Sequence, residues 1–395
     1  MFIFHPNRIK LSTLTGVFNR ASDVPAELWN ALNHKNCFLD KTYLNAVEQA
    51  NYEGVSFYYI FKKDKASKET TFHYFQIVDL VQRDLNSILN LEPYGQLLNV
   101  FSQALDKFIF GIKRNKPHYL VVSGNILLSG DYGVLSDKRD CEALMDSIEL
   151  IKKELNVKGK VVATIVKDLP KNDVKLVGFE KHKFLPMAMD PIMEFDVQPS
   201  WKTFDDYLNA LSSKYRVRTK NVMKKMEGVE IRDLDAKEFA KYKDTLHDLY
   251  KGVQQKSPVR LLSCKIEYLE NLLNLSTDRI IIRTFWKDNS MIAFLTVIMN
   301  GNELEAHHIG FDYKLNKQLS IYQNILYHYI EIAIQHQLQR ISFGRTALEI
   351  KSTVGAYPVD YRAFIRFENK IVNSLLYHVL PEKSGDDWIQ RNPFK

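Results

Sequence analysis

The fold is decided by the stretch from His307 to Pro358, which reads HHIGFDYKLNKQLSIYQNILYHYIEIAIQHQLQRISFGRTALEIKSTVGAYP. A strand that ends in a pair of histidines runs into an Asp-Tyr turn, and a long amphipathic helix follows. A short strand and a Gly-Arg-Thr corner then open another helix. Polar groups gather at the turns, and the elements between them are apolar. Sites are usually built in this way, because a rigid scaffold holds the reactive side chains that turns present.

The composition predicts a folded protein of two domains. The chain has 395 residues, and 45% of them are hydrophobic, which is enough to fill two cores and argues against disorder. The net charge of +7 is a small excess for this length. It permits an anionic partner, such as a phosphate-bearing carrier, RNA or an acidic membrane surface, but requires none.

Cysteine usage and hydropathy predict a cytoplasmic protein. Cys37, Cys141 and Cys264 lie far apart and form no CxxC pair, so we expect neither a disulfide framework nor a metal site. The N-terminal apolar run is too short for a signal peptide, and no stretch reaches the roughly 20 apolar residues of a membrane span. Peripheral contact with a membrane stays compatible with this sequence.

Periodicity divides the chain into two mixed α/β halves. In the first half, two aromatic and β-branched runs on either side of a charged turn predict an antiparallel hairpin. The elements expected there are helices over 25–50, 100–112 and 140–155 and strands over 55–61, 71–80, 118–128, 160–166 and 183–197.

A boundary is expected after residue 198, so the predicted domains are 1–198 and 199–395. Thr203 and Asp206 form a capping box for one helix that passes through a basic block and stops near Gly228. The later elements expected are helices over 235–252, 265–275 and 319–334 and strands over 229–232, 279–286, 291–299, 303–309, 340–343 and 359–367.

The second half resembles the acyltransferases of the GNAT superfamily, and within them the branch of FemAB-like, two-domain aminoacyl and acyl transferases. The resemblance rests on the order strand, strand, strand, long helix, short strand over 279–343. It also rests on the turn GFDY over 310–313, the segment FGRTALEIKSTVG over 343–355 and the entry helix with YRVR over 215–218. Together these features cover residues 200–370.

The resemblance implies an α/β (α+β) fold of two tandem GNAT-like domains, each a mixed, largely antiparallel sheet flanked by helices. The first half is similar only in size and element order, so we expect a degenerate domain there and the acyltransferase domain in the second half. The resemblance also implies that backbone groups polarise the reacting carbonyl where neighbouring strands separate.

One departure concerns the donor. Members of the superfamily bind the pyrophosphate of coenzyme A on a Gly-rich loop that opens the long helix, because glycine lets backbone N–H groups close on the phosphates. Residues 312–320 read DYKLNKQLS, with no glycine, although Lys314 and Lys317 supply charge. Free acetyl-CoA is therefore disfavoured. An acyl-CoA or acyl carrier protein thioester is expected as a co-substrate, with charged transfer RNA as the alternative.

Acyl transfer to an amine needs a base for the amine, polarisation of the carbonyl and a proton for the leaving group. On the strand over 303–309, alternation places Glu305 and His307 on one face, and these are the candidates for the base. The alternative is a solvent-facing polar stripe. His308 alternates with apolar residues and is expected to be a core histidine on the other face.

The turn before the long helix supplies further candidates. Tyr313 is placed to protonate the leaving group or to orient the donor, and Asp312 to hold a neighbouring group. The alternative is an Asx-type turn with a packing tyrosine. Lys317 is expected to bind the donor through its charge.

Arg345 and Lys351 are expected to bind an anion of the donor. Arg345 precedes Thr346, which forms a predicted capping box with Glu349, so its guanidinium lies near a helix N-terminus. A cation there opposes the helix dipole unless an anion is also present, and a phosphate or carboxylate would supply it. Lys351 lies further along the helix and can reach the same anion. The alternative for Lys351 is a surface ion pair with Glu349 or another acidic residue.

A basic block in the entry helix could bind RNA, a carrier protein or anionic lipid heads. The alternative is a solvated helix face. No DNA partner is expected, and the motifs of covalent hydrolases, NTPases, zinc proteases and dinucleotide-binding proteins are missing from the sequence. The basic residues of the block are Lys214, Arg216, Arg218, Lys220, Lys224 and Lys225.

These observations predict an N-acyltransferase that moves an acyl group from a thioester carrier to an amine on a small, lipid or cell-wall precursor acceptor by direct attack. One alternative is an aminoacyl-tRNA-dependent transferase of cell-wall peptides. The basic block and the missing glycine loop favour that alternative, and the lack of a long coiled-coil arm between the halves argues against it. Another is a binding protein that has kept the fold and lost the donor site.

Overall fold

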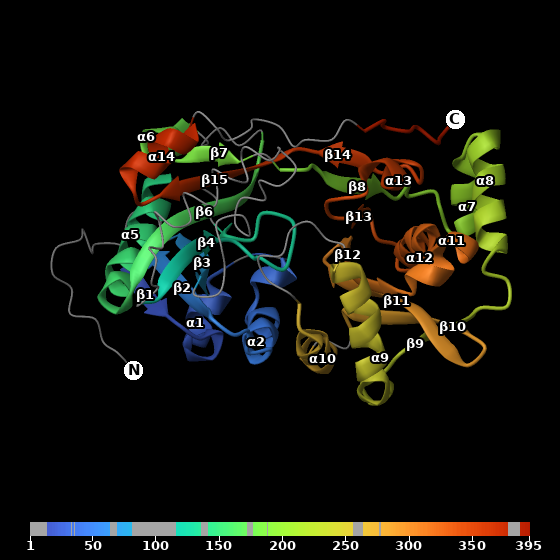
Figure 1. Cartoon of the computed structure of the whole chain (residues 1–395), viewed down its shortest axis with the longest axis horizontal. Coiled ribbons are helices and arrows are strands. Elements are labelled where there is room, and N and C mark those ends of the chain that lie inside the picture. Colours follow the sequence, from blue (N-terminus) through green and yellow to red (C-terminus); the bar gives the residue numbers. More distant parts are fainter. Residues whose placement is uncertain are drawn as a thin grey trace.

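The computed structural model describes residues 14–32, 34, 36–63, 69–80, 116–135, 141–171, 177–187, 189–255, 264–275, 278–377 and 388–395. Two sheets lie side by side along the longest axis of the molecule, and helices cover both faces of each (Figure 1). This arrangement confirms the predicted α/β fold of two domains with mixed sheets. The helix predicted over 100–112 lies outside the described residues.

The first sheet has the order β1-β2-β3-β4-β6-β15-β7, and the short β5 pairs with β3. Its strands are antiparallel except for β4 and β6, which run parallel. The predicted hairpin is confirmed, because β2 and β3 pair in register over their whole length. The strands are β1 (Leu14–Phe18), β2 (Val55–Lys63), β3 (Thr70–Asp79), β4 (His118–Ser123), β5 (Val134–Leu135), β6 (Lys160–Pro170), β7 (Leu185–Met187) and β15 (Tyr361–Phe367).

The second sheet has the order β14-β8-β13-β12-β11-β10-β9. Here β12 and β13 are the parallel pair. The second sheet therefore repeats the pattern of the first, because each sheet has one parallel pair of strands with antiparallel pairs on both sides of it. Its strands are β8 (Ile192–Asp196), β9 (Glu230–Asp233), β10 (Ile280–Lys287), β11 (Ser290–Asn300), β12 (Glu303–Phe311), β13 (Arg340–Ser342) and β14 (Tyr357–Val359).

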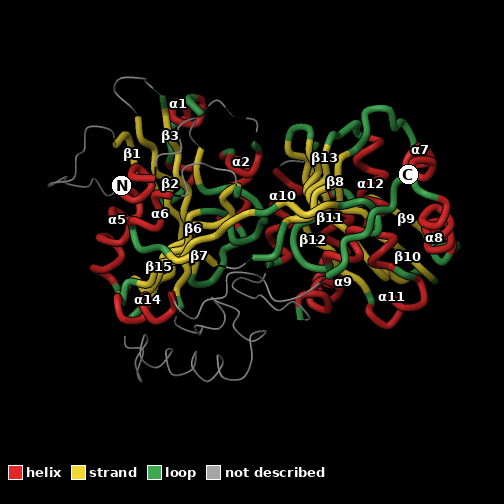
Figure 2. The backbone as a smooth tube through the Cα atoms, turned by 90° about the horizontal axis from the view of Figure 1, so that it is seen from above, coloured by secondary structure: helices red, strands yellow, loops and turns green. Residues whose placement is uncertain are grey.

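The two sheets exchange one strand each. β8 precedes residue 198 in the sequence, but it pairs with β13 and β14 of the second sheet. β15 comes near the end of the chain, but it pairs with β6 and β7 of the first sheet. Figure 2 shows both sheets from above, joined by these crossing segments. The predicted division at 198/199 therefore follows chain order and not sheet membership.

Helices cover both faces of the sheets and also join them. α2 of the first half packs against α10 of the second, and the hydroxyl oxygens of Tyr43 and Tyr268 on these helices lie 2.9 Å apart. Apolar side chains around these helices form one core that is continuous between the halves. The helices are α1 (Ala26–Asn30), α2 (Lys41–Gln49), α5 (Cys141–Lys158), α6 (Val177–Lys181), α7 (Phe204–Ala210), α8 (Ser213–Lys224), α9 (Ala236–Gln254), α10 (Ile266–Leu275), α11 (Tyr313–Leu319), α12 (Ile321–Gln335), α13 (Leu348–Ser352) and α14 (Lys370–Tyr377), with 3-10 turns at Ala21–Asp23 and Cys37–Leu39. Among these described helices, none has the length and apolar character needed to cross a membrane.

The helix predicted to run unbroken to Gly228 is interrupted, although the capping box at its start is present. α7 and α8 are separated at Leu211, whose extended backbone pairs with Phe394. The N–H of Ser212 donates to the carbonyl of Pro393 at 2.9 Å. The prediction failed because the C-terminal residues, far away in the sequence, take up the backbone groups at the break.

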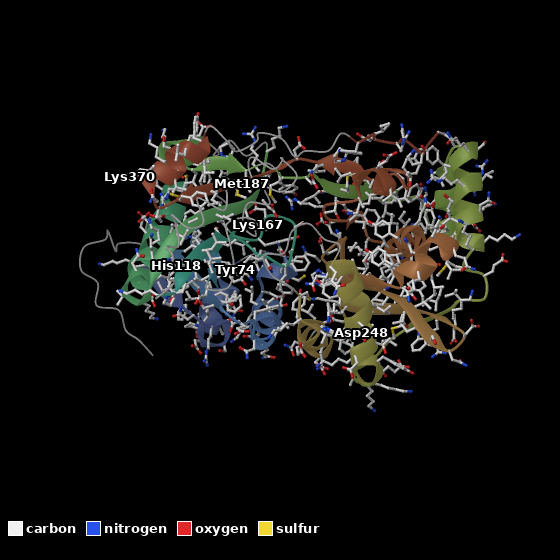
Figure 3. The ribbon with its side chains drawn as sticks, viewed as in Figure 1. Tyr74, His118, Lys167, Met187, Asp248 and Lys370 are labelled. Atoms are coloured by element: carbon white, nitrogen blue, oxygen red, sulfur yellow. The ribbon has the colours of Figure 1, made fainter. Side chains whose placement is uncertain are left out.

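A buried ion pair joins the two halves at Asp168. A bulge in β6 sets Lys167 and Asp168 opposite Ala363 of β15. Arg345, which follows β13, donates from Nη2 to Asp168 Oδ1 at 2.7 Å, and the N–H of Gly130 donates to Oδ2 at 2.9 Å. Lys167, labelled in Figure 3, also contacts this carboxylate. Burial by itself would raise the pKa of Asp168, but its cationic and N–H partners hold that pKa below its usual value.

We expect the carboxylate of Asp168 to stabilise the junction of the halves. Asp168→Asn keeps the shape of the side chain, and asparagine tolerates the positive φ of 58°. The substitution leaves two buried cations without their anion, so the free energy of unfolding should fall by about 3 kcal/mol or more in urea denaturation.

The control is Asp360→Asn, which removes an exposed ion pair with Lys171 whose charged atoms are 2.7 Å apart. Its loss should be below about 1 kcal/mol. Equal losses in the two variants would show that the buried carboxylate has no special part in holding the halves.

Candidate active site

The parallel strands β12 and β13 separate after a short pairing. They pair over three positions, which end at Glu305 and Ser342, whereas β4 and β6 of the first sheet pair over six. β12 continues to Phe311 after β13 has ended. Beyond Glu305, this edge of β12 therefore has no strand partner among the described strands.

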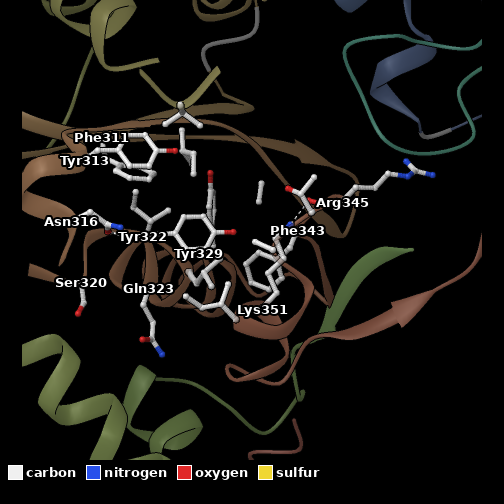
Figure 4. A pocket seen from close by; sticks show the side chains of 18 of the residues that line it. Phe311, Tyr313, Asn316, Ser320, Tyr322, Gln323, Tyr329, Phe343, Arg345 and Lys351 are labelled. Carbon is white, nitrogen blue, oxygen red and sulfur yellow. Dashed lines mark hydrogen bonds between the residues drawn. The ribbon is translucent and has the colours of Figure 1, made fainter. Parts of the chain in front are cut away.

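A cavity of about 640 Å³ occupies the gap and extends to the start of α12 (Figure 4). We call it the donor cavity. Its walls come from β12, α11, α12 and the loop between β13 and α13. Among the described residues that line it, the cationic side chains are Lys317, Arg345 and Lys351, and none carries a carboxyl group. The other lining residues are Val253, Ala306, His307, Ile309, Phe311, Tyr313, Asn316, Ser320, Tyr322, Gln323, Ile325, Leu326, Tyr329, Phe343, Thr346, Ala347 and Ile350.

His307 reaches the donor cavity at a bulge in β12. Thr296 of β11 faces both His307 and His308 there, and its hydroxyl accepts from the His308 N–H at 2.7 Å and donates to the His308 carbonyl at 2.9 Å. Burial lowers the pKa of His307 well below its usual value. The imidazole is therefore neutral at physiological pH, as a general base must be. Its Nε2 has no hydrogen-bond partner among the described residues.

The predicted alternation along β12 is wrong at His308. Leu304 and Ala306 pack on the α12 side as predicted, but His308 does not join them. Its ring centroid lies 3.9 Å from that of His307, and Tyr268 packs edge-on against both rings. The reason is the bulge, which inserts one residue and breaks the period of two.

Glu305 lines a smaller cavity between the two halves and not the donor cavity. Its side chain is 6% exposed. Burial raises the pKa of this carboxyl to about 8, against the opposing effect of a hydrogen bond with Ser342. A pKa near neutral suits a group that accepts a proton. The two predicted bases, Glu305 and His307, thus lie two residues apart and line adjoining cavities.

The three site residues predicted at the start of α11 have different surroundings. Asp312 caps the helix, and its Oδ1 accepts from the N–H of Lys314 at 2.8 Å. Tyr313 and Lys317 line the donor cavity. The Tyr313 ring centroid is 4.5 Å from that of Phe311, and burial raises the pKa of Tyr313, so its phenol keeps its proton. Lys317 is exposed at the rim.

Arg345 already has an anion within the chain. Its guanidinium binds the carboxylate of Asp168, and its Nε donates to the carbonyl of Asp190 at 2.9 Å. In Figure 4 its side chain extends away from the other labelled residues. The anion that the sequence predicted beside Arg345 is therefore supplied by the first half.

The capping box predicted at Thr346 and Glu349 is wrong. Thr346 and Ala347 have positive φ values of 65° and 50°, and no side chain caps the helix that follows. Glu349 instead accepts from Nε of Arg391 at 3.0 Å. The loop is drawn into this shape by bonds to distant residues, which a local motif does not reveal.

Lys351 supports this loop from inside. It is 4% exposed, and its Nζ donates to the carbonyls of Arg345 at 2.6 Å and Gly344 at 3.2 Å. Burial lowers its pKa to about 7, with Glu305 acting in the opposite direction. The surface ion pair with Glu349, the alternative for this lysine, is absent because Lys351 points inward.

Sequence reasoning missed the tyrosines of α12 as site residues. Tyr322 and Tyr329 fall among the apolar positions of the helix predicted over 319–334 and were not singled out, but both line the middle of the donor cavity (Figure 4). The Tyr329 hydroxyl donates to the carbonyl of Thr296 at 3.2 Å, next to the bulge. Their spacing of seven residues puts both side chains on one helix face, and this spacing is the signal in the sequence that could have identified them.

The start of α12 gives the donor cavity a basic rim. Ser320 takes a left-handed conformation with φ of 51°, where glycine would be the usual residue. Its hydroxyl lies 3.1 Å from Nζ of Lys225, and Asn316 Oδ1 accepts from the N–H of Tyr322 at 2.9 Å. The positive end of the helix, Lys225 and Lys317 therefore meet at one edge of the cavity.

Glu305 should make the stability of the protein depend on pH. Its pKa in the folded protein, about 8, lies above the ordinary value of 4.5, so folding favours the protonated carboxyl. This contribution is complete below the ordinary pKa and is lost as the pH rises through 8. We expect Glu305→Gln to remove a loss of roughly 3 kcal/mol in the free energy of unfolding between about pH 5 and pH 8.5.

Urea denaturation across this pH range measures the effect. The control is Glu267→Gln, because N–H groups of its own helix turn and Lys243 lower the pKa of Glu267, and this carboxylate stays charged throughout. The control should keep the wild-type profile. A Glu305→Gln profile identical to wild type would contradict the assigned environment.

Comparisons with known proteins identify the fold. No family model matches the chain, and no curated protein matches its sequence. FemX matches with a TM-score of 0.55 and 10% identity over 92% of this chain and 100% of its own. A tandem GNAT protein from the clavulanic acid biosynthesis pathway has a TM-score of 0.46 and 8% identity over 89% of this chain and 98% of its own. A probable N-acyltransferase from Enterococcus faecalis V583 has a TM-score of 0.40 and 9% identity over 89% of this chain and 72% of its own. The match to FemX shows that the chain has the two-domain fold of that protein, which confirms the resemblance to FemAB-like proteins at the level of the fold.

Proposed function

We propose that this protein is an N-acyltransferase that moves an acyl group from a thioester carrier, acyl-CoA or acyl carrier protein, to an amine. The observation that carries the proposal is the donor cavity, which joins an aromatic and aliphatic interior to a basic rim. Phosphates of the carrier fit the rim at the start of α12. The thiol arm and the acyl group fit the interior, where β12 and β13 separate.

The charge of the lining favours a donor whose acyl group is uncharged. An aminoacyl group carries an ammonium group, which needs a carboxylate or several oxygen acceptors when it leaves water. The described lining offers the amines of Lys317 and Lys351 and no carboxyl group, so an ammonium group would be repelled. The lining therefore favours a thioester donor over charged transfer RNA.

Direct attack needs no covalent intermediate on the protein. The amine gives a proton to Glu305 or His307, its nitrogen bonds to the thioester carbon, and the C–S bond breaks. The thiolate then takes a proton, for which Tyr313 is the candidate donor. Backbone groups of β12 beyond the paired region can polarise the carbonyl. The acceptor is an amine on a small, lipid or cell-wall precursor molecule.

Incubation with acetyl-CoA, a long-chain acyl-CoA and acyl carrier protein thioesters tests the proposal. Thermal stabilisation by a thioester, with thiol release when an amine is added, is the expected result. A parallel experiment offers charged transfer RNA as the donor. Transfer from it that ribonuclease abolishes, together with no response to any thioester, would overturn the proposal in favour of aminoacyl transfer.

Two substitutions should separate donor binding from chemistry. Lys317→Glu places a negative charge at the rim, so the KM for the thioester should rise about tenfold with kcat little changed. His307→Gln should lower kcat by roughly 10²-fold or more with little change in KM if the imidazole accepts the proton.

The control is Lys237→Glu, which makes the same charge change at an exposed position of α9 outside the cavity lining. It should leave both constants as in the wild type. An equal rise in KM for both lysine variants would mean that Lys317 acts only through net charge. Unchanged kcat in His307→Gln would exclude His307 as the base.

A further inference from the structure

A second cavity, of about 280 Å³, lies between the two halves. We call it the acidic chamber. Tyr132 and Tyr361 line it from the first sheet and its loops, and β12 and β13 line it from the second. The linings of the two cavities follow each other along β12, where Glu305 lines the chamber and His307, two residues further on, lines the donor cavity.

Carboxyl groups dominate the charge of this chamber. Asp131, Glu194, Glu303 and Glu305 line it, and Arg340 is the cationic side chain among its described lining residues. Nη1 of Arg340 lies 3.4 Å from Glu194 and 3.7 Å from Glu303, and its Nε lies 3.4 Å from Asp196, so one guanidinium is shared among three carboxyl groups. The charge therefore stays negative even when Glu305 is protonated.

Glu305 is a buried carboxyl without a counter-ion among the described residues. The cations whose charge acts on Glu305 are engaged elsewhere, since Lys167 binds Asp168 and Lys351 donates to the carbonyls of Gly344 and Arg345. The partner of Glu305 is the hydroxyl of Ser342, which leaves most of its acceptor capacity unused. Buried carboxyl groups are normally paired, and the chamber leaves room beside this one for a cation.

The arrangement of the carboxyl groups suits an organic ammonium group and not a metal ion. Within the described residues, no three or more His, Cys, Asp or Glu side chains are grouped closely enough to hold a metal. The carboxyl groups are spread around the cavity and do not converge on one position, as metal ligands would. An ammonium group on a carbon chain can use such a spread of acceptors, because its hydrogen bonds and charge act over several ångströms.

The acidic chamber opens on an outer groove of about 600 Å³. Chamber and groove share Asn36, Asn300, Glu303 and Arg340. The groove adds the amide side chains of Asn302 and Gln339 and the carboxyl group of Asp196, which pairs with Arg340. Amides both donate and accept hydrogen bonds, so they suit an uncharged polar molecule. The chamber itself is at the small end of the range of ligand pockets, about 300–1,000 Å³, and takes only one end of such a molecule.

We propose that the acidic chamber binds the acceptor through a protonated primary amine, while the uncharged polar remainder of the acceptor lies in the outer groove. The proposal rests on the acyltransferase function and names the chemical class of its acceptor. The amine then sits where β12 and β13 separate, next to the thioester carbon in the donor cavity.

The negative charge of the chamber also explains how the bound amine loses a proton and why the product leaves. The ammonium group gives its proton to the carboxylate of Glu305, which the entering cation has stabilised. The neutral amine nitrogen bonds to the acyl carbon, the C–S bond breaks, and the second proton that the nitrogen loses goes to the leaving thiolate. The amide product carries no charge at this nitrogen, so its attraction to the chamber is lost and release is favoured.

Calorimetric binding of matched probes to the full-length protein tests the proposal. 1,5-Diaminopentane is compared with 1,5-pentanediol, and glucosamine with glucose, so that each pair differs in its amino and hydroxyl groups. At least one amine should bind about tenfold or more tightly than its alcohol. Equal binding within both pairs, or no binding by any amine, would overturn the proposal.

Substitutions in the acidic chamber test whether the amine binds there. The double variant Glu194→Gln with Glu303→Gln removes two carboxylates and keeps their size, so amine affinity should fall about tenfold or more while alcohol affinity stays constant. The control is Glu230→Gln on β9, whose exposed carboxyl pairs with Arg232 and lies outside the chamber lining. An equal fall in the control would mean that the amine binds through net charge and not in the chamber.

Thioester stabilisation of the same variants keeps the two proposals apart. If thioesters stabilise the protein and the amines are not distinguished from alcohols, the acidic chamber is not the acceptor site and the acyltransferase function stands. If amines bind selectively and no thioester acts, the chamber is an amine site and the acyltransferase function fails.

Discussion

The exchange of β8 and β15 is the constraint on which the rest of the structure depends. Each of these strands lies between two partners in the sheet of the other half. Pulling the halves apart would expose two rows of backbone N–H and C=O groups, and buried groups of this kind are nearly always paired. The Arg345–Asp168 ion pair lies at the same junction. The geometry between the halves is therefore constant enough for a chamber lined by both to serve as part of a site.

The early end of the β12–β13 pairing creates the donor cavity. β13 stops at Ser342 because the next residues turn away, held by β8 on one side and by Lys351 and Asp168 on the other. The corresponding strands of the first sheet, β4 and β6, pair over six positions, which is twice as many. The two sheets have the same topology. The second has a cavity at its parallel pair because the loop after β13 turns away from β12. The charges then divide, with amines around the donor cavity and carboxyl groups around the acidic chamber.

Much of the fold follows from local pattern, and the site follows only in part. The hairpin of β2 and β3, the capping box at Thr203 and the order of elements in the second half were all predicted correctly. His307, Tyr313, Lys317, Arg345 and Lys351 do come together around one cavity. For several of the predicted residues, the contacts in the structure give a different role from the one that the sequence predicted. Arg345 is neutralised by Asp168, and the predicted cap at Thr346 gives way to a strained loop. Glu194 and Asp131 carry no local signal at all, because each acquires its role only beside residues from the other half.

The sequence by itself determined the elements, the mixed α/β class and the resemblance to a GNAT-like fold, because alternation, helical spacing and caps depend on neighbours a few residues apart. Only the tertiary structure decided which sheet β8 and β15 join, where β12 bulges, which helices meet between the halves and which carboxyl group faces Arg345. Those choices depend on contacts between residues far apart in the chain, where burial and hydrogen-bond satisfaction outweigh local preference.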